Sequence, residues 1–282
     1  MSVELAKAYS PYADELFKAE SKRELLTNTD YDWSGAHSVL VYKISTVALN
    51  DYSREKSSIE SSSESTISRF GSIDDLSASV EELMLKKDRS FIFNIDKLDK
   101  DETASAVQAS TALARELREV VVPEVDTYTY GVMVANAGHK AEAAALGKTN
   151  IYNAILKGSQ ALDDSEVPDT DRVLVVTPAV YAILKQAVEF DHNEVGAELR
   201  KLGVVGMLDG MNVVKIPSSR LPDKFGFMIA HPAATVAPVK LEDYGLHTDT
   251  PLSSGTIVTG RICYDAFVLE NKKNGIYYQA TV

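Results

Sequence analysis

The sequence predicts an α+β fold in which one long helix joins a strand-rich N-terminal half to a compact α/β half. Three observations support this prediction. Residues 101–122 place apolar side chains three and four positions apart, which is the spacing of one helix face. Extended, alternating segments precede this helix, and short buried strands alternate with helical patterns after it. A rod that joins two such unlike halves would act as a spine for the molecule.

The predicted spine helix begins near Asp101, a residue type that favours the N-cap, and Glu102 adds negative charge where a helix N-terminus favours it. At ~1.5 Å per residue this helix is roughly 30 Å long. We expect Pro123 to end or kink it, because proline lacks the amide proton and crowds the preceding turn. Residues 124–138 then either continue as a kinked helix or, given their Tyr, Thr and Val content, include a strand.

Residues 1–32 resemble an arm rather than a folded domain. Lys and Glu residues fill the faces between its apolar positions, and Ser10-Pro11 interrupts its helical spacing. The arm therefore buries little apolar surface by itself, and we expect it to lie on another part of the protein or on a neighbouring copy. Its apolar residues near helical spacing are Leu5, Tyr9, Tyr12, Leu16 and Phe17.

The pattern of residues 50–79 predicts a long loop that extends away from the rest of the protein. Seven of the twelve residues from 57 to 68 are serine, although strand-like patterns at 37–45 and 82–96 flank the segment. The prediction is a two-stranded loop with its tip near residues 61–71. Two-stranded ribbons are marginal in water and their open edges invite pairing, so another subunit should cover this loop. The alternative is a disordered surface loop.

The second half predicts an α/β layer that ends in a β-hairpin. The turn at Asp209-Gly210 separates two strands, and the residue pair Asn274-Gly275 marks the turn of the closing hairpin. The expected elements, in order, are a helix at 149–164 capped by Thr149 or Asn150, a strand at 172–177, a helix through 187 capped by Thr177-Pro178, strands within 204–217, the segments 225–232 and 234–241 around a short turn or helix, and the hairpin at 256–282.

Composition limits the possible classes of protein. The 282 residues are 45% hydrophobic and 25% charged, which is ordinary for a globular chain. No run approaches the roughly 20 apolar residues of a membrane helix, and the charged N-terminus does not resemble a signal peptide. The single cysteine, Cys263, is expected to be a small buried residue in a strand, which points to folding in the cytosol. A net charge of −12 works against tight, sequence-independent DNA binding.

No pattern in the sequence indicates catalysis. The acidic run at 96–102 lacks the glycine and closing glutamate of a calcium loop, and the glycines of 203–210 lie in a strand pair rather than a phosphate cradle. The five histidines show no ligand spacing, and a charged surface loop explains the acids and histidine at 189–194. We therefore expect no enzyme, no catalytic residue, no cofactor and no metal site.

The order of parts, taken with five segments, carries a family resemblance. These segments are LKKDRSFIFNIDKLDKDET, VVPEVDTYTYGVMVANAG, RVLVVTPAVYAIL, VVGMLDGMNVVKIPSSRLP and GRICYDAFVLENKKNGIYY. Along nearly its whole length the chain resembles the Hong Kong 97-type major capsid proteins of tailed bacteriophages. The resemblance implies a Hong Kong 97-like capsid fold with an N-terminal arm, an extended β-hairpin loop, a spine helix, a peripheral domain and an axial α/β domain.

The resemblance also implies a division of the chain. The expected parts are an N-terminal arm at 1–32, the first strand of the peripheral domain at 33–45, the extended loop at 46–87, the peripheral domain with the spine helix at 88–123, the axial domain at 124–250 and the C-terminal hairpin of the peripheral domain at 251–282. Residues 191–198 or 218–224 would form the axial tips. The expected inter-subunit contact residues are Arg54, Lys56, Arg69, Phe70, Lys86, Lys87, Asp191, Glu194 and Arg220.

The function implied by the resemblance is self-assembly, as hexamers and pentamers, into an icosahedral head that encloses double-stranded DNA. The implied partners are further copies of the chain, a separate scaffolding protein, a portal protein and a decoration protein, with assembly in the host bacterial cytoplasm, no sequence-specific DNA contact and no membrane. Only about thirty residues precede the first strand, so we expect no proteolytic removal of an N-terminal scaffold, and nothing local marks a Lys–Asn crosslink. We expect an acidic inner wall that does not grip DNA.

Two other functions are considered. An encapsulin-like bacterial nanocompartment shares the fold but encloses a cargo enzyme, and a cargo peptide on the inner wall would distinguish it. A soluble binding protein with a long mobile loop would instead be a monomer or small oligomer, with residues 57–68 cut quickly by protease.

Overall fold

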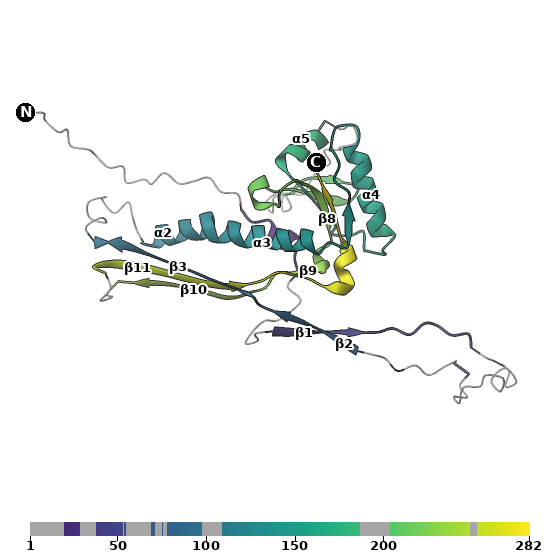
Figure 1. Cartoon of the computed structure of the whole chain (residues 1–282), viewed down its shortest axis with the longest axis horizontal. Helices are drawn as coiled ribbons and strands as arrows, with labels where there is room; N and C mark the ends of the chain where they lie inside the picture. The colour runs from purple at the N-terminus through teal and green to yellow at the C-terminus, as the bar shows by residue number, and fades with distance from the viewer. Residues whose placement is uncertain are drawn as a thin grey trace, which may run out of the picture. The chain divides into compact units, whose positions relative to one another are not determined.

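The computed structural model describes residues 20–28, 38–52, 54, 69–70, 75, 78–97, 109–186, 204–248 and 253–282. The chain divides into two compact units, one formed by Met1–Ser34 with Leu85–Val282 and the other by Gly35–Met84 (Figure 1). The larger unit contains two sheets that lie against one long helix. The predicted division into six segments stays a prediction.

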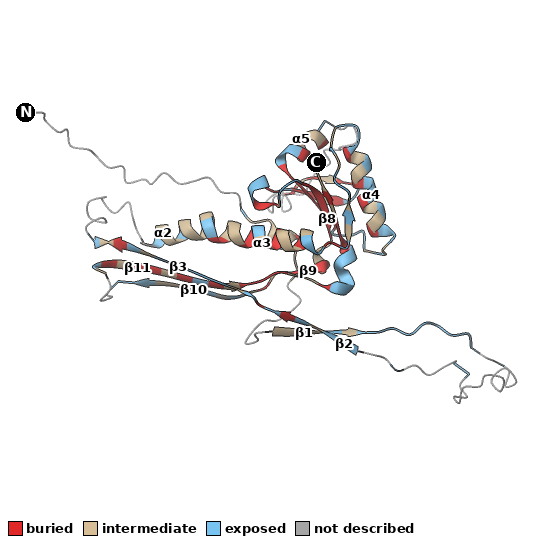
Figure 2. Cartoon of the chain, in the orientation of Figure 1, coloured by how far each residue is buried: buried red, intermediate tan, exposed pale blue. Residues whose placement is uncertain are grey.

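A six-stranded mixed sheet forms the centre of the larger unit. Its order is β4-β13-β8-β5-β7-β6; β5 runs parallel to β7 and β13 parallel to β4, whereas the other pairs are antiparallel. The strands are β4 (His139–Ala141), β5 (Val173–Val176), β6 (Val204–Leu208), β7 (Met211–Lys215), β8 (Phe225–Ala230) and β13 (Ile276–Ala280). Figure 2 shows buried residues, in red, gathered in this sheet around β8.

Helices cover both faces of this sheet. Along β5, Leu174 and Val176 pack with α4 (Ile151–Asp163) and α5 (Pro178–Leu184) on one face. Val173 and Val175 pack with Tyr130 and Met133 of the spine helix on the other. Successive strand residues point to opposite faces, so a strand covered on both sides must be apolar at every position. This explains the continuous apolar run in β5.

Local chemistry fixes several of these boundaries as predicted. Thr177 is the N-cap of α5, and its Oγ1 accepts a hydrogen bond from the Val180 amide at 3.2 Å. α5 ends at Leu184, three residues before the expected end. Between β6 and β7, Asp209 and Gly210 both have positive φ, at 48° and 76°, which is the backbone of a two-residue hairpin turn.

The spine helix continues past Pro123. It comprises α2 (Ala109–Glu116), a π-helical turn η3 (Leu117–Val121) and α3 (Val122–Ala135), and Pro123 occupies the first turn of α3. The expectation that Pro123 could end the helix is therefore wrong, and the kinked-helix alternative for 124–138 is the better one. The π-helical turn directly before Pro123 is a local adjustment of the kind that lets a helix carry such a residue. The expected N-cap, Asp101, lies outside the described residues.

The strand alternative for residues 127–133 is also wrong, because burial follows helical spacing. Within α3 the buried residues recur at one, three and four positions, which places them on one side of a helix. They are Val125, Asp126, Thr129, Tyr130 and Met133. The expected domain boundary between residues 123 and 124 therefore falls inside a continuous helix.

A three-stranded antiparallel sheet lies along the spine helix (Figure 1). Ile262 and Tyr264 of this sheet pack against Val121 and Val125 of the helix. The strands are β10 (Val239–His247), β11 (Gly255–Tyr264) and β3 (Lys87–Asp96), in the order β10-β11-β3. The small elements at its edge are β9 (Thr235–Val236), β12 (Phe267–Val268), η4 (Ser218–Arg220), η5 (Pro232–Ala234) and η6 (Glu270–Gly275).

The predicted C-terminal hairpin is wrong. β11 pairs with β3 and β10, whereas β13 pairs with β8 and β4 in the other sheet. β12 and the 3₁₀ segment η6 carry the chain from one sheet to the other, so the two long strands never meet. The single strand pattern expected at 82–96 likewise divides into β2 (Ala78–Met84) and β3, which pair with different strands.

Residues 20–28 belong to the packed core of the larger unit. Leu26, directly after the short 3₁₀ turn η1 (Arg23–Leu25), is fully buried beside Tyr130. The Asn28 amide donates to the Thr235 carbonyl at 2.9 Å, and Asn28 bridges to Val236. The described part of the expected arm is thus built into the fold, while residues 1–19 and 29–32 lie outside the described residues.

The smaller unit is a two-stranded antiparallel ribbon. β1 (Ser38–Ile44) pairs with β2 over seven residues, from Ser38 opposite Met84 to Ile44 opposite Ala78. This pairing confirms that strands flank the serine-rich segment as a two-stranded excursion. The serine-rich residues 57–68 themselves lie outside the described residues.

Replacement of Leu26 tests whether residues 20–28 are part of the core. Leu26→Ala should lower the free energy of unfolding by about 2–5 kcal/mol, because it removes buried methyl groups and leaves a cavity. Urea denaturation measures the change. Glu24→Ala, on an exposed neighbour in the same segment, is the control and should have little effect. Equal stability of Leu26→Ala and the unsubstituted chain would contradict this placement.

Candidate functional site

One face of the β1–β2 ribbon is apolar and open. Leu40, Tyr42 and Ile44 alternate along β1 and are 52%, 69% and 68% exposed. Because Tyr42 pairs directly with Val80, and Ser38 with Met84, the exposed Val80 and Met84 lie on the same face of β2. We call these five side chains the ribbon face. Glu82, which pairs with Leu40 and is exposed, places one carboxylate among these apolar side chains. Clustered exposed apolar side chains of this kind mark an interaction site.

The opposite face of the ribbon mixes polar and apolar side chains and is less exposed: Val39 and Val41 are half-buried, and Leu83 is buried. Lys43 Nζ lies 3.1 Å from Glu81 Oε2, and both side chains are largely covered. The two faces of the ribbon therefore differ in exposure, and the ribbon face is the open one. Farther along the chain, the rings of Tyr52 and Phe70 meet edge to face at 5.1 Å, and Phe70 is exposed.

The sequence-predicted contact residues are scattered. Arg54, Arg69 and Phe70 are exposed in the smaller unit. Lys86 is exposed, and its backbone amide donates to Asp265 Oδ2 at 2.8 Å. Lys87 is half-buried, with Nζ 4.8 Å from the centre of the Tyr128 ring. Whether these residues contact neighbouring copies stays a prediction.

The other four predicted contact residues differ in position. Lys56, Asp191 and Glu194 lie outside the described residues. Arg220 is not on the surface: it is 4% exposed, and its Nη1 lies 2.8 Å from Oδ2 of Asp126. The polar segment 218–224 suggested a surface tip, but the guanidinium turns inward because a buried carboxylate on α3 binds it.

Asp126 and Arg220 form a buried polar centre that holds the N-terminal segment. Asp126, 1% exposed, accepts from Ser21 Oγ at 2.7 Å through Oδ1 and from Arg220 through Oδ2. Arg220 Nη1 also donates to the Glu20 carbonyl at 3.4 Å. One carboxylate thus connects α3, η4 and the start of the described chain. Sequence reasoning missed Asp126, because a single acid in an apolar helix carries no local signal.

A second polar centre joins the spine helix to the three-stranded sheet. The carboxylate of Asp265 accepts from the Lys86 amide and from the Tyr128 hydroxyl at 2.7 Å. Burial, with this hydrogen bond, raises the pKa of Tyr128 above its usual range. Tyr264 donates to Glu124 Oε1 at 3.1 Å, and burial together with that carboxylate raises the pKa of Tyr264 to about 12. These phenols remain neutral donors at physiological pH.

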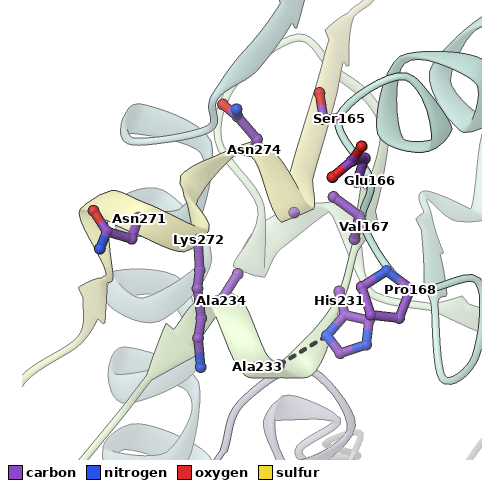
Figure 3. Close-up of a pocket in the computed structure, with 11 residues that line it drawn as sticks. Ser165, Glu166, Val167, Pro168, His231, Ala233, Ala234, Asn271, Lys272 and Asn274 are labelled. Carbon is purple, nitrogen blue, oxygen red and sulfur yellow. Dashed lines mark hydrogen bonds between the residues drawn. The ribbon is translucent and has the colours of Figure 1, made fainter. Parts of the chain in front are cut away.

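A pocket of about 280 Å³ opens beside the six-stranded sheet, lined by residues from the α4–β5 loop, η5 and η6 (Figure 3). His231 Nδ1 accepts from the Ala233 amide at 3.2 Å. Burial lowers the pKa of His231, so its ring is neutral at pH 7. The lining is mostly small or apolar around His231, with Lys272 and Asn271 on η6. Glu166, from the α4–β5 loop, adds a carboxylate to this lining.

Within the part of the chain that the structure describes, no three His, Cys, Asp or Glu side chains gather as a possible metal site. No helix among these same residues has the length and apolar character to cross a membrane.

Comparison with known proteins identifies the family. The family model described as "Phage capsid protein" matches residues 83–278, which is more than half of the chain. The chain belongs to this phage capsid protein family. The matched residues begin at the end of β2 and include the spine helix and both sheets of the larger unit. No curated protein matches the chain at a significant level.

Solved structures share the fold at low sequence identity. The chain is similar to one from Mycobacterium phage Che8, with 18% identity, a TM-score of 0.75 and coverage of 98% of this chain and 96% of that one. It is also similar to the capsid structure of Cyanophage P-SCSP1u, with 12% identity, a TM-score of 0.73 and coverage of 99% of this chain and 93% of that one. The mature capsid of bacteriophage PhiM1 matches with 12% identity, a TM-score of 0.71 and coverage of 100% of this chain and 92% of that one. The predicted Hong Kong 97-type capsid fold is confirmed.

The family defines the role of this capsid protein. It is a major capsid protein, a structural rather than an enzymatic component, and it assembles in many copies into the capsid shell of a virion. The nanocompartment alternative has weaker support, because the matching family is a phage capsid family.

Removal of the Asp126 carboxylate tests the buried centre. Asp126→Ala should lower the free energy of unfolding by about 3–5 kcal/mol, because it removes the carboxylate that neutralises the buried Arg220 guanidinium. It should also expose Lys22 and Arg23 to trypsin, since Ser21 loses its acceptor. Urea denaturation and mass spectrometry of timed digests measure the two effects.

The matched control is Asp163→Ala. Asp163 also pairs with a buried arginine, at 2.7 Å from Arg172 Nη1, but Asp163 itself is 59% exposed. Arg172 keeps two backbone carbonyl acceptors, so the control should cost less than about 1 kcal/mol. Equal losses in the two variants, or unchanged digestion of Asp126→Ala, would contradict the role of Asp126.

Proposed function

We propose that the chain forms the hexamers and pentamers of an icosahedral phage head that encloses double-stranded DNA, and that the ribbon face provides a principal contact between copies. The open ribbon face carries this proposal. A ring or shell is built by heterologous contacts, in which a patch on one copy meets a different patch on the next. A ribbon with one open, mostly apolar face is suited to such a contact.

Energetics favours burial of the ribbon face in the shell. An isolated two-stranded ribbon is marginal in water, and this one leaves Tyr42 and Ile44 more than two-thirds exposed. Removing apolar surface from water contributes about 25 cal/mol per Å². Each copy in a closed shell would gain this contribution, and the many weak contacts add up to a stable particle. In a single, unassembled copy the ribbon face would stay exposed to water, and this stabilisation would be absent.

The charge of the chain agrees with a container for DNA rather than a DNA-binding protein. The net charge is −12, and tight binding to the phosphate backbone depends on Lys and Arg. An acidic inner wall would let packaged DNA move out during ejection. We propose a separate scaffolding protein, a portal protein and a decoration protein as partners, with assembly in the host cytoplasm. These partners rest on the resemblance to Hong Kong 97-type capsid proteins.

A charge placed on the ribbon face tests the proposal. Val80→Asp should lower the yield of assembled particles at least about tenfold, because burial of an unpaired carboxylate costs more than the ~1.4 kcal/mol that corresponds to that factor. Negative-stain microscopy and size-exclusion chromatography of purified protein, alone and with a candidate scaffold, measure the yield.

Ser79→Asp is the matched control, since it adds the same side chain one position earlier on the opposite face. Ser79 is exposed and pairs with Lys43, so a carboxylate there meets a cation. The control should assemble like the unsubstituted chain. Normal particles from Val80→Asp would contradict the ribbon contact, and a monomer from the unsubstituted chain under all conditions would favour a soluble binding protein.

A further inference from the structure

A groove of about 310 Å³ runs between the spine helix and the three-stranded sheet, on the β10 side. Residues of the spine helix, of β10 and β11, and of the N-terminal segment line it. The lining residues are Ser21, Arg23, Glu24, Leu117, Val121, Val122, Val125, Asp126, Val239, Glu242, Tyr244 and Ile262. We call this the arm groove.

The arm groove is apolar inside and charged at its rim. Leu117, Val122 and Tyr244 are only half-buried, so they offer apolar surface to a further side chain. Arg23 places one positive charge among the lining residues, and the acidic residues there are Glu24, Asp126 and Glu242. A fitting occupant would therefore have large apolar side chains flanked by charges of both signs.

The chain itself is held at the end of this groove. Ser21 lines the groove and is fixed by its hydrogen bond to Asp126, and Arg220 holds the Glu20 carbonyl. Leu16 is four residues before Glu20, and an extended chain of that length spans at most about 14 Å. Any apolar residue just before Glu20 thus remains close to the groove.

We propose that the arm groove is the docking site for Leu16 and Phe17 of the same chain. These are the nearest large apolar residues before Glu20. Their side chains could cover the half-buried apolar residues that line the groove. Glu15 and Lys18 flank them. Lys18 would complement the exposed carboxylates of Glu24 and Glu242 in the groove lining, and Glu15 would complement Arg23. Docking would cover apolar surface that the spine helix leaves half-exposed, and it would set the direction of the remaining arm. The inference does not depend on the geometry of the shell.

A disulfide between arm and groove tests this directly. In the full-length chain with Cys263→Ser, the pair Phe17→Cys and Val122→Cys should form an intrachain disulfide under mild oxidation, since bridged residues must have Cα atoms within ~7 Å. Non-reducing denaturing gels and peptide mass spectrometry identify the bond. More than half of the chains should be crosslinked within the chain.

The control pairs Phe17→Cys with Val120→Cys. Val120 lies two residues away on the same helix but lines a different, smaller hollow of about 140 Å³ on the β3 side. It should crosslink at least fivefold less. Equal crosslinking of both pairs, or none with Val122→Cys, would overturn the proposal. An interchain bond would show that the arm of a second copy occupies the groove, which would also overturn it.

Proteolysis gives a second readout without cysteines. Leu16→Asp should raise the rate of tryptic cleavage after Lys18 at least fivefold, because a charged side chain disfavours an apolar groove. Leu5→Asp places the same charge in the arm, eleven residues farther from the groove, and should leave that rate unchanged. Equal rates in the two variants would count against docking. Particle yield, measured in parallel, separates failure of this inference from failure of the shell function.

Discussion

The larger unit depends on one continuous helix that packs against two different sheets. Val121 and Val125 pack on the three-stranded sheet, whereas Tyr130 and Met133 enter the core of the six-stranded sheet. The two cores therefore share a single rigid element, and its continuity through Pro123 fixes their relative positions. The π-helical turn allows this continuity. A break at Pro123 would leave each sheet with a short helix of its own and no rigid connection.

Polar groups, together with apolar contacts, determine where the N-terminal segment packs on the larger unit. A buried ion pair often adds little net stability, because the loss of hydration offsets the attraction between the charges. The pair between Asp126 and Arg220 is more informative as a positional constraint. It connects the middle of the spine helix, the η4 turn and Ser21, which lie far apart in sequence. The N-terminal segment, which carries several charged residues, is thereby fixed in one place, with Leu26 in the core.

Sequence patterns predicted the features that depend on local chemistry. Periodicity indicated the spine helix and the strands on both sides of the serine-rich segment, while Thr177 and Asp209-Gly210 marked a cap and a turn. Pairing between distant strands leaves no such local signal, and the predicted closing hairpin was wrong for this reason. After η6, β13 pairs with β8 rather than with β11. Burial of Arg220 and Leu26 likewise depends on groups that only the folded chain brings together, so the polar or charged segments around them suggested a surface.

The family and the fold assign a shell-forming role, and the ribbon face indicates how copies would be held together. Its apolar side chains have no covering within the described part of the ribbon, whereas most apolar residues of both sheets in the larger unit are buried. The most direct measurement is a cryo-electron microscopy map of particles assembled from the purified full-length chain. The account predicts closed shells in which a neighbouring copy covers Leu40, Tyr42 and Ile44. Shells in which these side chains face solvent, or failure of the chain to assemble with any scaffold, would contradict it.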